Sequence, residues 1–283
     1  MRVAFLGPEG TFSEEALFAS ADREHVEPAP EPTIYDCVMA VQERRVERAI
    51  VPIENSLEGS VNATLDALAL ETDAVTIVGE VIHPVQHCLI ARAAIPFEQI
   101  ERVVSHPQAN AQCSRFIRGQ LPDATVVAAD STADAVRLVA ESDRPWAALG
   151  NRLSAEIYGC VVLEAGVEDI SGNETRFVWL GREQAGTPEP VRDDHWKTSI
   201  VFWGLPDAPG ALISILAEFA EREINLTKIE SRPLKLGLGR YIFFADLEGH
   251  RLEPAIVAAI EAVGRSVETL RVLGSYPAAR PAS

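Results

Sequence analysis

Short apolar runs typical of β-strands alternate with segments of helical periodicity over the first two thirds of the chain. The runs are RVAFLG, RAIVPI, VTIVGEVI, RVVS, TVVAA, WAALG and RFVWLG. The segments between them, such as residues 132–140, place apolar residues at the spacing of one helix face. This alternation predicts parallel α/β sheets, in which ligands bind beyond the carboxyl ends of the strands.

The last third of the chain has a different pattern. Four strand-like runs, TSIVFWG, INLTKIES, RYIFFADL and SVETLRVLG, are interrupted by two stripes of helical spacing. The order βαββαβ predicts a small ferredoxin-like domain. Residues 181–196 are rich in Gly, Pro and charge and separate the two patterns. We therefore predict one domain over residues 1–182 and a second over residues 197–276.

Composition excludes several classes of partner. The 283 residues are 47% hydrophobic, which is enough for two packed cores. A net charge of −17 is unfavourable for binding nucleic acid, so no such partner is expected. No apolar run approaches the roughly 20 residues that a membrane span needs. Because the net charge is strongly negative, any anionic substrate must be bound by local donors.

The cysteines and the N-terminus predict a cellular location. Four scattered cysteines without a C-x-x-C pair suit reduced thiols better than disulfides or a zinc site, so we expect no metal. The first residues, MRVAFLGPEG, lack the apolar core of a signal peptide. Both features predict a cytoplasmic protein.

Two polar segments follow predicted strands in the first domain. In GPEGTFSEEA, Thr11 and Glu14 fit a capping box, so a helix begins there with free N–H groups that could bind an anion. An ordinary capped helix explains the segment equally well. In VPIENSLEGSV, the polar residues Glu54, Asn55 and Ser56 end a strand. They could line a cleft, or they could only form a turn.

Two further segments carry polar groups next to strands. In SHPQANAQC, Ser105 occupies an N-cap position, and Gln112 lies on the resulting helix. His106 beside a proline is expected to be structural. In SGNETRFVWLG, Arg176 needs a carboxylate from the protein or from a ligand, and Thr175 offers a neutral donor beside it. A structural salt bridge would satisfy Arg176 as well.

The usual signatures of cofactor or nucleophile chemistry are missing from the sequence. It has no G-x-S-x-G, no P-loop, no G-x-G-x-x-G after a strand and no H-E-x-x-H. We therefore expect no cofactor, and either cofactor-free chemistry or no chemistry.

Taken in this order, GPEGTFS, VPIENSLEGSV, SHPQANAQC, NETRF and the later ESRP resemble prephenate dehydratase with a regulatory ACT domain. The resemblance implies decarboxylating dehydration of prephenate to phenylpyruvate in phenylalanine biosynthesis. It also implies an α/β catalytic domain of two lobes, similar to type II periplasmic binding proteins, with the substrate in the cleft. Since GPEGTFS begins at Gly7, we expect no chorismate mutase domain ahead of it.

The resemblance also implies roles for individual residues. Thr175 would assist loss of the hydroxyl, and Arg176 would hold a carboxylate. Residues implied to contact substrate are Thr11, Phe12, Asn55, Ser105, Gln112 and Asn173. Glu54 and Ser56 would support this group from behind, and Glu174 would face away.

In the second domain, the resemblance implies a phenylalanine site between paired ACT domains. Its residues would be Gly210, Ala211, Leu212, Asn225, Glu230 and Ser231. Such a site predicts a homodimer or homotetramer inhibited by L-phenylalanine. A dimerisation module that has lost its ligand is the alternative.

Two other functions are compatible with the sequence. Arogenate dehydratase would share the motifs and differ only by an amino group on the substrate. A non-catalytic amino-acid-binding regulator could share the two-lobed architecture. The pairing of Thr175 with Arg176 favours an enzyme over a binder, because a binder needs no donor at the leaving oxygen.

Overall fold

The computed structural model describes residues 1–182, 195–234 and 239–279, which form two compact units. The first unit consists of Met1–Thr64 and Ile82–Phe177, and the second of Leu65–Val81 and Val178–Ser283. The second unit thus takes in one segment of the predicted first domain, Leu65–Val81, together with the predicted second domain. One reason is that Arg271 donates hydrogen bonds to the carbonyls of Ala69 and Thr72, at 2.8 and 2.7 Å. Most of the predicted linker lies outside the described residues.

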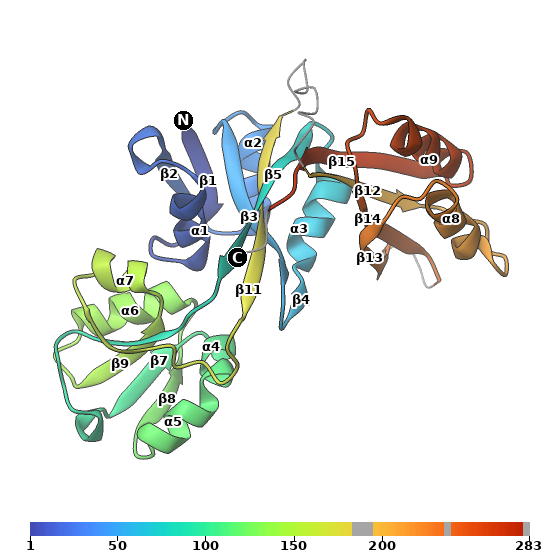
Figure 1. Ribbon diagram of the computed structural model, residues 1–283. Coiled ribbons are helices and arrows are strands. Elements are labelled where there is room, and N and C mark those ends of the chain that lie inside the picture. Colours follow the sequence, from blue (N-terminus) through green and yellow to red (C-terminus); the bar gives the residue numbers. More distant parts are fainter. Residues whose placement is uncertain (183–194, 235–238, 280–283) are drawn as a thin grey trace. The chain divides into compact units, whose positions relative to one another are not determined.

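The first sheet of unit 1 is built on β1 (Arg2–Leu6), which pairs in parallel with β2 (Glu27–Glu31) and β3 (Arg48–Asn55). A short strand, β4 (Gly59–Ser60), turns back antiparallel to β3. The helical elements of this part are α1 (Phe12–Ser20), η1 (Arg23–His25) and α2 (Ile34–Gln42) (Figure 1). The prediction missed β2, because its sequence EPAPE carries two prolines and prolines are confined to sheet edges and bulges.

The second sheet of unit 1 has the order β10-β6-β9-β7-β8. Its strands are β6 (Cys88–Ala91), β7 (Arg102–Ser105), β8 (Thr125–Ala128), β9 (Trp146–Gly150) and β10 (Val161–Ala165). The strands β7, β8 and β9 are parallel as predicted, whereas β6 runs antiparallel to β9 and β10. The helical elements are η3 (Phe97–Gln99), α4 (Pro107–Gln112), α5 (Ser114–Gln120), α6 (Thr132–Glu141) and α7 (Arg152–Ile157). The prediction missed β6 and β10.

The chain crosses between the units within three elements. These are α3 (Asn62–Asp66), β5 (Val75–Pro84) and β11 (Glu174–Arg182). A single turn of π-helix, η2 (Ala67–Glu71), follows α3. The helix α3 follows the hairpin of β3 and β4, so the chain enters the second unit shortly after that hairpin.

Unit 2 contains the predicted βαββαβ order, which is confirmed. Its elements are β12 (Trp196–Trp203), α8 (Ala211–Ala220), β13 (Leu226–Pro233), β14 (Tyr241–Glu248), α9 (Pro254–Gly264) and β15 (Thr269–Pro277). The strands pair antiparallel in the order β13-β14-β12-β15. Apolar residues of both helices and of the sheet form one buried core, including Phe202, Phe219 and Val263. Among the residues described, no helix has the length and hydropathy to cross a bilayer.

Candidate active site

Thr175 lies at the start of β11 on the buried face of that strand. In an extended strand, alternate side chains share a face. Accordingly Asn173, Thr175 and Phe177 are 4%, 8% and 2% exposed, whereas Glu174 between them is exposed. The Thr175 hydroxyl oxygen accepts a hydrogen bond of 2.9 Å from the side-chain amide of Asn55. The two predicted motifs that follow β3 and open β11 therefore meet here.

The orientation of the Asn55 amide follows from its backbone contacts. Its Oδ1 accepts the N–H groups of Leu57 and Glu58, both at 3.0 Å. A carbonyl oxygen can accept these bonds and an amino group cannot. The Nδ2 group must therefore face β11, where it donates to Asn173 Oδ1 at 2.8 Å and to the Thr175 hydroxyl at 2.9 Å. The turn after β3 thus fixes which groups of β11 remain free for a ligand.

Asn173 and Thr175 retain unused donors. Asn173 Oδ1 accepts from Asn55 and also from the Ser56 hydroxyl, at 3.2 Å. Ser56 Oγ in turn accepts the backbone N–H of Glu174 at 3.0 Å. Within the described part of the chain, neither the Asn173 amino group nor the Thr175 hydroxyl hydrogen has a hydrogen-bond acceptor. The site therefore presents two neutral donors on one face of the strand, as an anionic or oxygen-rich ligand requires.

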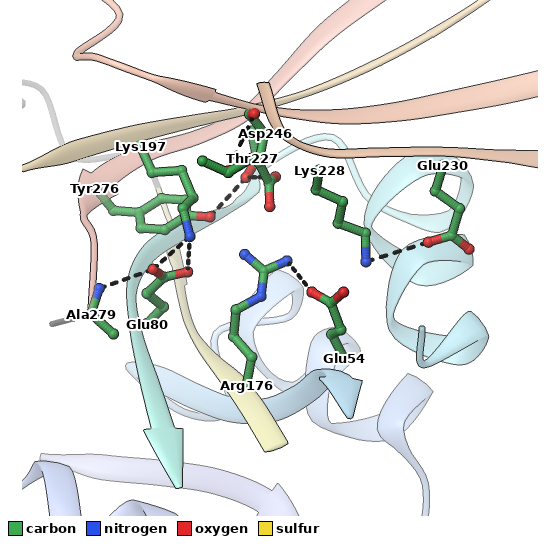
Figure 2. Close-up of polar contacts among 11 residues, drawn as sticks. Glu54, Glu80, Arg176, Lys197, Thr227, Lys228, Glu230, Asp246, Tyr276 and Ala279 are labelled. Carbon is green, nitrogen blue, oxygen red and sulfur yellow. Dashed lines mark hydrogen bonds and ion pairs between the residues drawn. The ribbon is translucent and has the colours of Figure 1, made fainter. Parts of the chain in front are cut away.

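Arg176 projects from the opposite side of the strand to Thr175. Its guanidinium lies 3.2 Å from the carboxylate of Glu54, and the Arg176 side chain is 11% exposed (Figure 2). The expectation that Arg176 needs a carboxylate is met by the protein itself. The alternation of the extended backbone explains why the hydroxyl of Thr175 and the guanidinium of Arg176 do not share a face. Ser56 and Glu54 are therefore tied to opposite faces of β11.

Hydrogen bonds hold the loop before α1 to the end of β1 and to the first turn of α1. The Thr11 hydroxyl donates to the Leu6 carbonyl at 2.8 Å and accepts the N–H of Glu14 at 3.4 Å. The Glu14 carboxylate accepts from Gly10 N at 2.5 Å, one residue before the position expected in a capping box. Burial raises the pKa of Glu14. The predicted helix start at Thr11 is correct, and its hydroxyl is already engaged.

The motif SHPQANAQC is arranged differently from the prediction. Ser105 ends β7, is fully buried, and donates its hydroxyl to the Leu149 carbonyl at 2.8 Å. The N-cap of α4 is His106, whose Nδ1 accepts from Gln108 N at 3.3 Å. The prediction that Ser105 caps the helix is wrong by one residue, because β7 extends through Ser105. His106 has the structural role that was expected.

Gln112 connects three segments of unit 1. Its Nε2 donates to a carboxylate oxygen of Glu58 at 3.3 Å, and its Oε1 lies 3.0 Å from Nε2 of His87. The His87 ring makes an edge-to-face contact with the Phe12 ring, with centroids 5.5 Å apart. Predicted site residues Phe12 and Gln112 thus meet through a residue that the sequence analysis did not select.

His87 and Glu58 were missed for identifiable reasons. His87 is 3% exposed, and its burial lowers its pKa. It precedes the run CLIA, which was not predicted as strand β6, so its position at a strand end was not recognised. Glu58 is exposed and lies in a turn, where an acidic residue carries no sequence signal of function.

The backbone conformation explains why the residue predicted to begin the effector site of unit 2 is a glycine. Gly210 has a φ of +85°, which side chains other than glycine rarely adopt, and it is the N-cap of α8. A Cβ atom placed on Gly210 would meet nothing within 4 Å. The space above the start of α8 is therefore open. Ala211 and Leu212 are the first two residues of that helix and are half-buried.

The remaining predicted effector residues lie along β13. The Asn225 carbonyl accepts from Glu248 N at 3.0 Å, which ties the start of β13 to the end of β14. Glu230 forms an ion pair of 3.3 Å with Lys228 on the same face of the strand (Figure 2). Ser231 is exposed on the other face.

The described residues include no group of three or more His, Cys, Asp or Glu side chains that could hold a metal ion. All four cysteines are free thiols, three of them buried.

Comparison with known proteins identifies both parts of the chain. The family model for prephenate dehydratase matches residues 3–185, and the ACT domain model matches residues 198–265. A prephenate dehydratase from Methanocaldococcus jannaschii is 40% identical over 278 residues, covering 97% of each chain.

Solved structures give the same result for the fold. A prephenate dehydratase from Arthrobacter aurescens, in complex with L-Phe, is 37% identical with a TM-score of 0.88, covering 100% of this chain and 92% of that one. A structure described as GqqA, a novel type of quorum quenching acylases, is 32% identical with a TM-score of 0.87, covering 98% of each chain. The predicted class, an α/β catalytic domain with an ACT domain, is confirmed. The chain belongs to the prephenate dehydratase family.

Proposed function

We propose that this chain converts prephenate to phenylpyruvate, carbon dioxide and water, with Thr175 as the principal catalytic residue. The observation that carries the proposal is the arrangement around Asn55, which leaves the Thr175 hydroxyl hydrogen, on a buried face, without an acceptor among the described residues. Domain limits of 1–182 for catalysis and 197–276 for regulation are part of the proposal.

The reaction needs no base. The bond from the ring to its carboxylate breaks and releases carbon dioxide, and the electron pair moves into the ring. The ring becomes aromatic as the bond to the hydroxyl breaks, and the departing hydroxide takes a proton from the solvent to become water. A hydrogen-bond donor at this oxygen stabilises the charge that develops there. Thr175 supplies such a donor and keeps its own proton, since an aliphatic hydroxyl is a weak acid.

Neutral donors suit this substrate in this protein. Prephenate is a dianion, and the chain has a net charge of −17, so binding depends on local contacts. We propose that the amino groups of Asn173 and Gln112 bind substrate oxygens. Asn55, Ser56 and Ser105 are proposed to act by holding those groups and the strands that carry them.

Arg176 remains part of the proposal, in a role that its geometry favours. Its guanidinium is engaged by Glu54 at 3.2 Å, on the face of β11 opposite to Thr175. We propose that the pair fixes the ends of β3 and β11 relative to each other. Thr11 and Phe12 are proposed to shape the same site through the loop before α1.

The second domain is proposed to bind L-phenylalanine and to inhibit the enzyme. The residues proposed are Gly210, Ala211, Leu212, Asn225, Glu230 and Ser231. Support comes from the open space above Gly210 and from the Arthrobacter aurescens relative, which was solved with L-Phe. We further propose a homodimer or homotetramer. Exposed apolar side chains on α8, β13 and β14 favour such association, namely Ile213, Ile229 and Tyr241. The four free thiols favour a cytoplasmic location.

An absorbance assay for phenylpyruvate tests the activity. The purified protein should form phenylpyruvate from prephenate, and arogenate should be converted to phenylalanine much more slowly. A preference for arogenate would make the chain an arogenate dehydratase. An acylase assay in parallel tests the activity named for the GqqA structure. Failure with both ring acids, together with binding of an aromatic amino acid, would leave a regulator.

A phenylalanine titration tests the regulatory part. Millimolar L-phenylalanine should raise the melting temperature, because ligand binding to the folded state stabilises it, and should lower the initial rate. Asn225→Ala should weaken both effects and leave the uninhibited rate unchanged. Light scattering with and without the ligand measures the oligomeric state. A titration in which neither quantity changes would refute the effector site.

A further inference from the structure

Gln112 and His87 fix each other's hydrogen-bonding states. An ionised carboxylate such as that of Glu58 accepts hydrogen bonds and cannot donate them. The group of Gln112 that faces Glu58 at 3.3 Å is therefore the amino group. The amide oxygen of Gln112 must then face His87 Nε2, at 3.0 Å. An oxygen needs a donor, so the proton of the neutral His87 ring lies on Nε2 and not on Nδ1.

The His87 backbone is held so that this bond keeps its direction. Its N–H donates to the Glu168 carboxylate at 3.0 Å. Its carbonyl accepts the N–H groups of Gly166 and Val167, at 2.9 and 3.1 Å. The ring itself is packed edge-on against Phe12. The ring therefore has little freedom to turn away from Gln112.

Burying a histidine at position 87 costs free energy, and a role in packing alone does not explain why this cost is accepted. His87 is 3% exposed, and its Nδ1 has no hydrogen-bond partner among the described residues. A buried polar atom without a partner is unfavourable. An apolar side chain of similar size would fill the space without this cost. A histidine at this position gains only the bond from Nε2 to the Gln112 amide.

We propose that His87 is a positioning residue of the active site, which holds the amide oxygen of Gln112 so that its amino group faces the substrate. The proposal rests on the proposed function of Gln112 as a substrate-binding residue. The partner that this amino group has now is exposed Glu58, at the long distance of 3.3 Å. A substrate oxygen can replace that partner at small cost. Once a substrate oxygen has displaced Glu58, His87 is the side chain that still orients this amide, and without it the amide is free to rotate.

A double-mutant cycle on kcat/KM tests the proposal. His87→Leu and Gln112→Ala should each lower kcat/KM for prephenate by about 10- to 100-fold, mainly through KM, as for loss of one bond to a charged group. The double variant should match Gln112→Ala within about 3-fold, because His87 has nothing left to orient. Single effects that multiply in the double variant would overturn the proposal. So would a His87→Leu protein with the kinetics of the wild type.

Two polar replacements separate positioning from packing. His87→Gln can place an amino group near the position of Nε2, whereas His87→Asn reaches only the position of Nδ1. The Gln variant should recover most of the lost kcat/KM and the Asn variant should not. Equal activities of the two would contradict the proposal. His25→Gln, a change at an exposed histidine, is the matched control and should behave as the wild type. Thermal unfolding of each variant verifies that it is folded.

A measurement that needs no turnover completes the test. Nitrogen-15 NMR of the histidine rings should show His87 with its proton on Nε2 at neutral pH, in the protein as purified. Observation of the Nδ1-protonated form would overturn the proposal. A wild-type protein that does not convert prephenate, but does show the Nε2 form, would instead contradict the proposed function and leave the geometry of the pair standing.

Discussion

Replacement of Thr175 by valine removes one hydroxyl from the site and keeps the shape of the side chain. The proposed transition state then loses the donor at the leaving oxygen. By comparison with loss of one oxyanion donor, turnover should fall by about 10² to 10³, or roughly 3–4 kcal/mol. Since the donor acts mainly as charge develops on the leaving oxygen, kcat should fall far more than KM rises.

The same change should hardly affect stability, and the structure shows why. Asn55 Nδ2 loses one acceptor but keeps Asn173 Oδ1 at 2.8 Å and the Glu174 carbonyl at 3.2 Å. No buried donor is left without a partner, so the free energy of unfolding should fall by less than about 1 kcal/mol. A large loss of activity with little loss of stability is the specific signature expected of Thr175→Val.

The assay is phenylpyruvate formation at saturating prephenate, together with urea unfolding of each protein. Thr175→Ser keeps a hydroxyl and should retain activity within about 10-fold of the wild type. Thr76→Val makes the same chemical change at a hydroxyl that donates to the Gly181 carbonyl at 3.4 Å, and serves as the control. A folded Thr175→Val protein with near-normal kcat would refute the reasoning.

Three further predictions concern other contacts. Arg176→Gln and Glu54→Gln should lower kcat/KM to a similar extent, because the two side chains act as a pair. A much larger effect of Arg176→Gln, seen as a rise in KM, would indicate instead that Arg176 binds substrate directly. Lys197→Met should lower the free energy of unfolding by about 3 kcal/mol, measured in urea, because it removes the cation 2.8 Å from the Glu80 carboxylate, whose side chain is 1% exposed (Figure 2). At pH 8 a thiol reagent should modify Cys160 first, because the thiolate is the reactive form and burial raises the pKa of Cys37 and Cys113 to about 12. All four cysteines should react once the chain is unfolded in denaturant. Four rapid reactions in the folded protein would contradict this prediction.

The sequence predicted the elements whose patterns are long or regular. The βαββαβ order and the strands β7, β8 and β9 follow from apolar periodicity, which reports burial directly. The strands β2, β6 and β10 could not be predicted in this way. One carries prolines at alternate positions, and the other two adjoin β5 and β11 along the chain with no helix between, so they fall outside the alternation of strands and helices. Their partners, which lie far away in the sequence, decide that they are strands.

Site residues that belong to a motif could be predicted, and those defined by distant contacts could not. Motifs located Asn55, Thr175 and Gln112 near strand or helix ends, and the structure connects the first two by a hydrogen bond. Which face each side chain occupies was not predicted for Arg176, although strand alternation implies it once β11 is known to begin at Glu174. His87 could not be identified, because the role proposed for it depends on a contact with a residue 25 positions away.

The contacts of Arg271 limit how this protein can be dissected. A fragment that stops at residue 182 would keep Ala69 and Thr72 but lose the guanidinium that binds their carbonyls. It would also lose Gly274 of β15, the residue that pairs with Ile77 of β5. A truncated catalytic half would thus expose unpaired backbone at the end of a helix and along a strand, and it is expected to aggregate. Catalytic and regulatory functions are better separated by point substitutions in the intact chain than by cutting it.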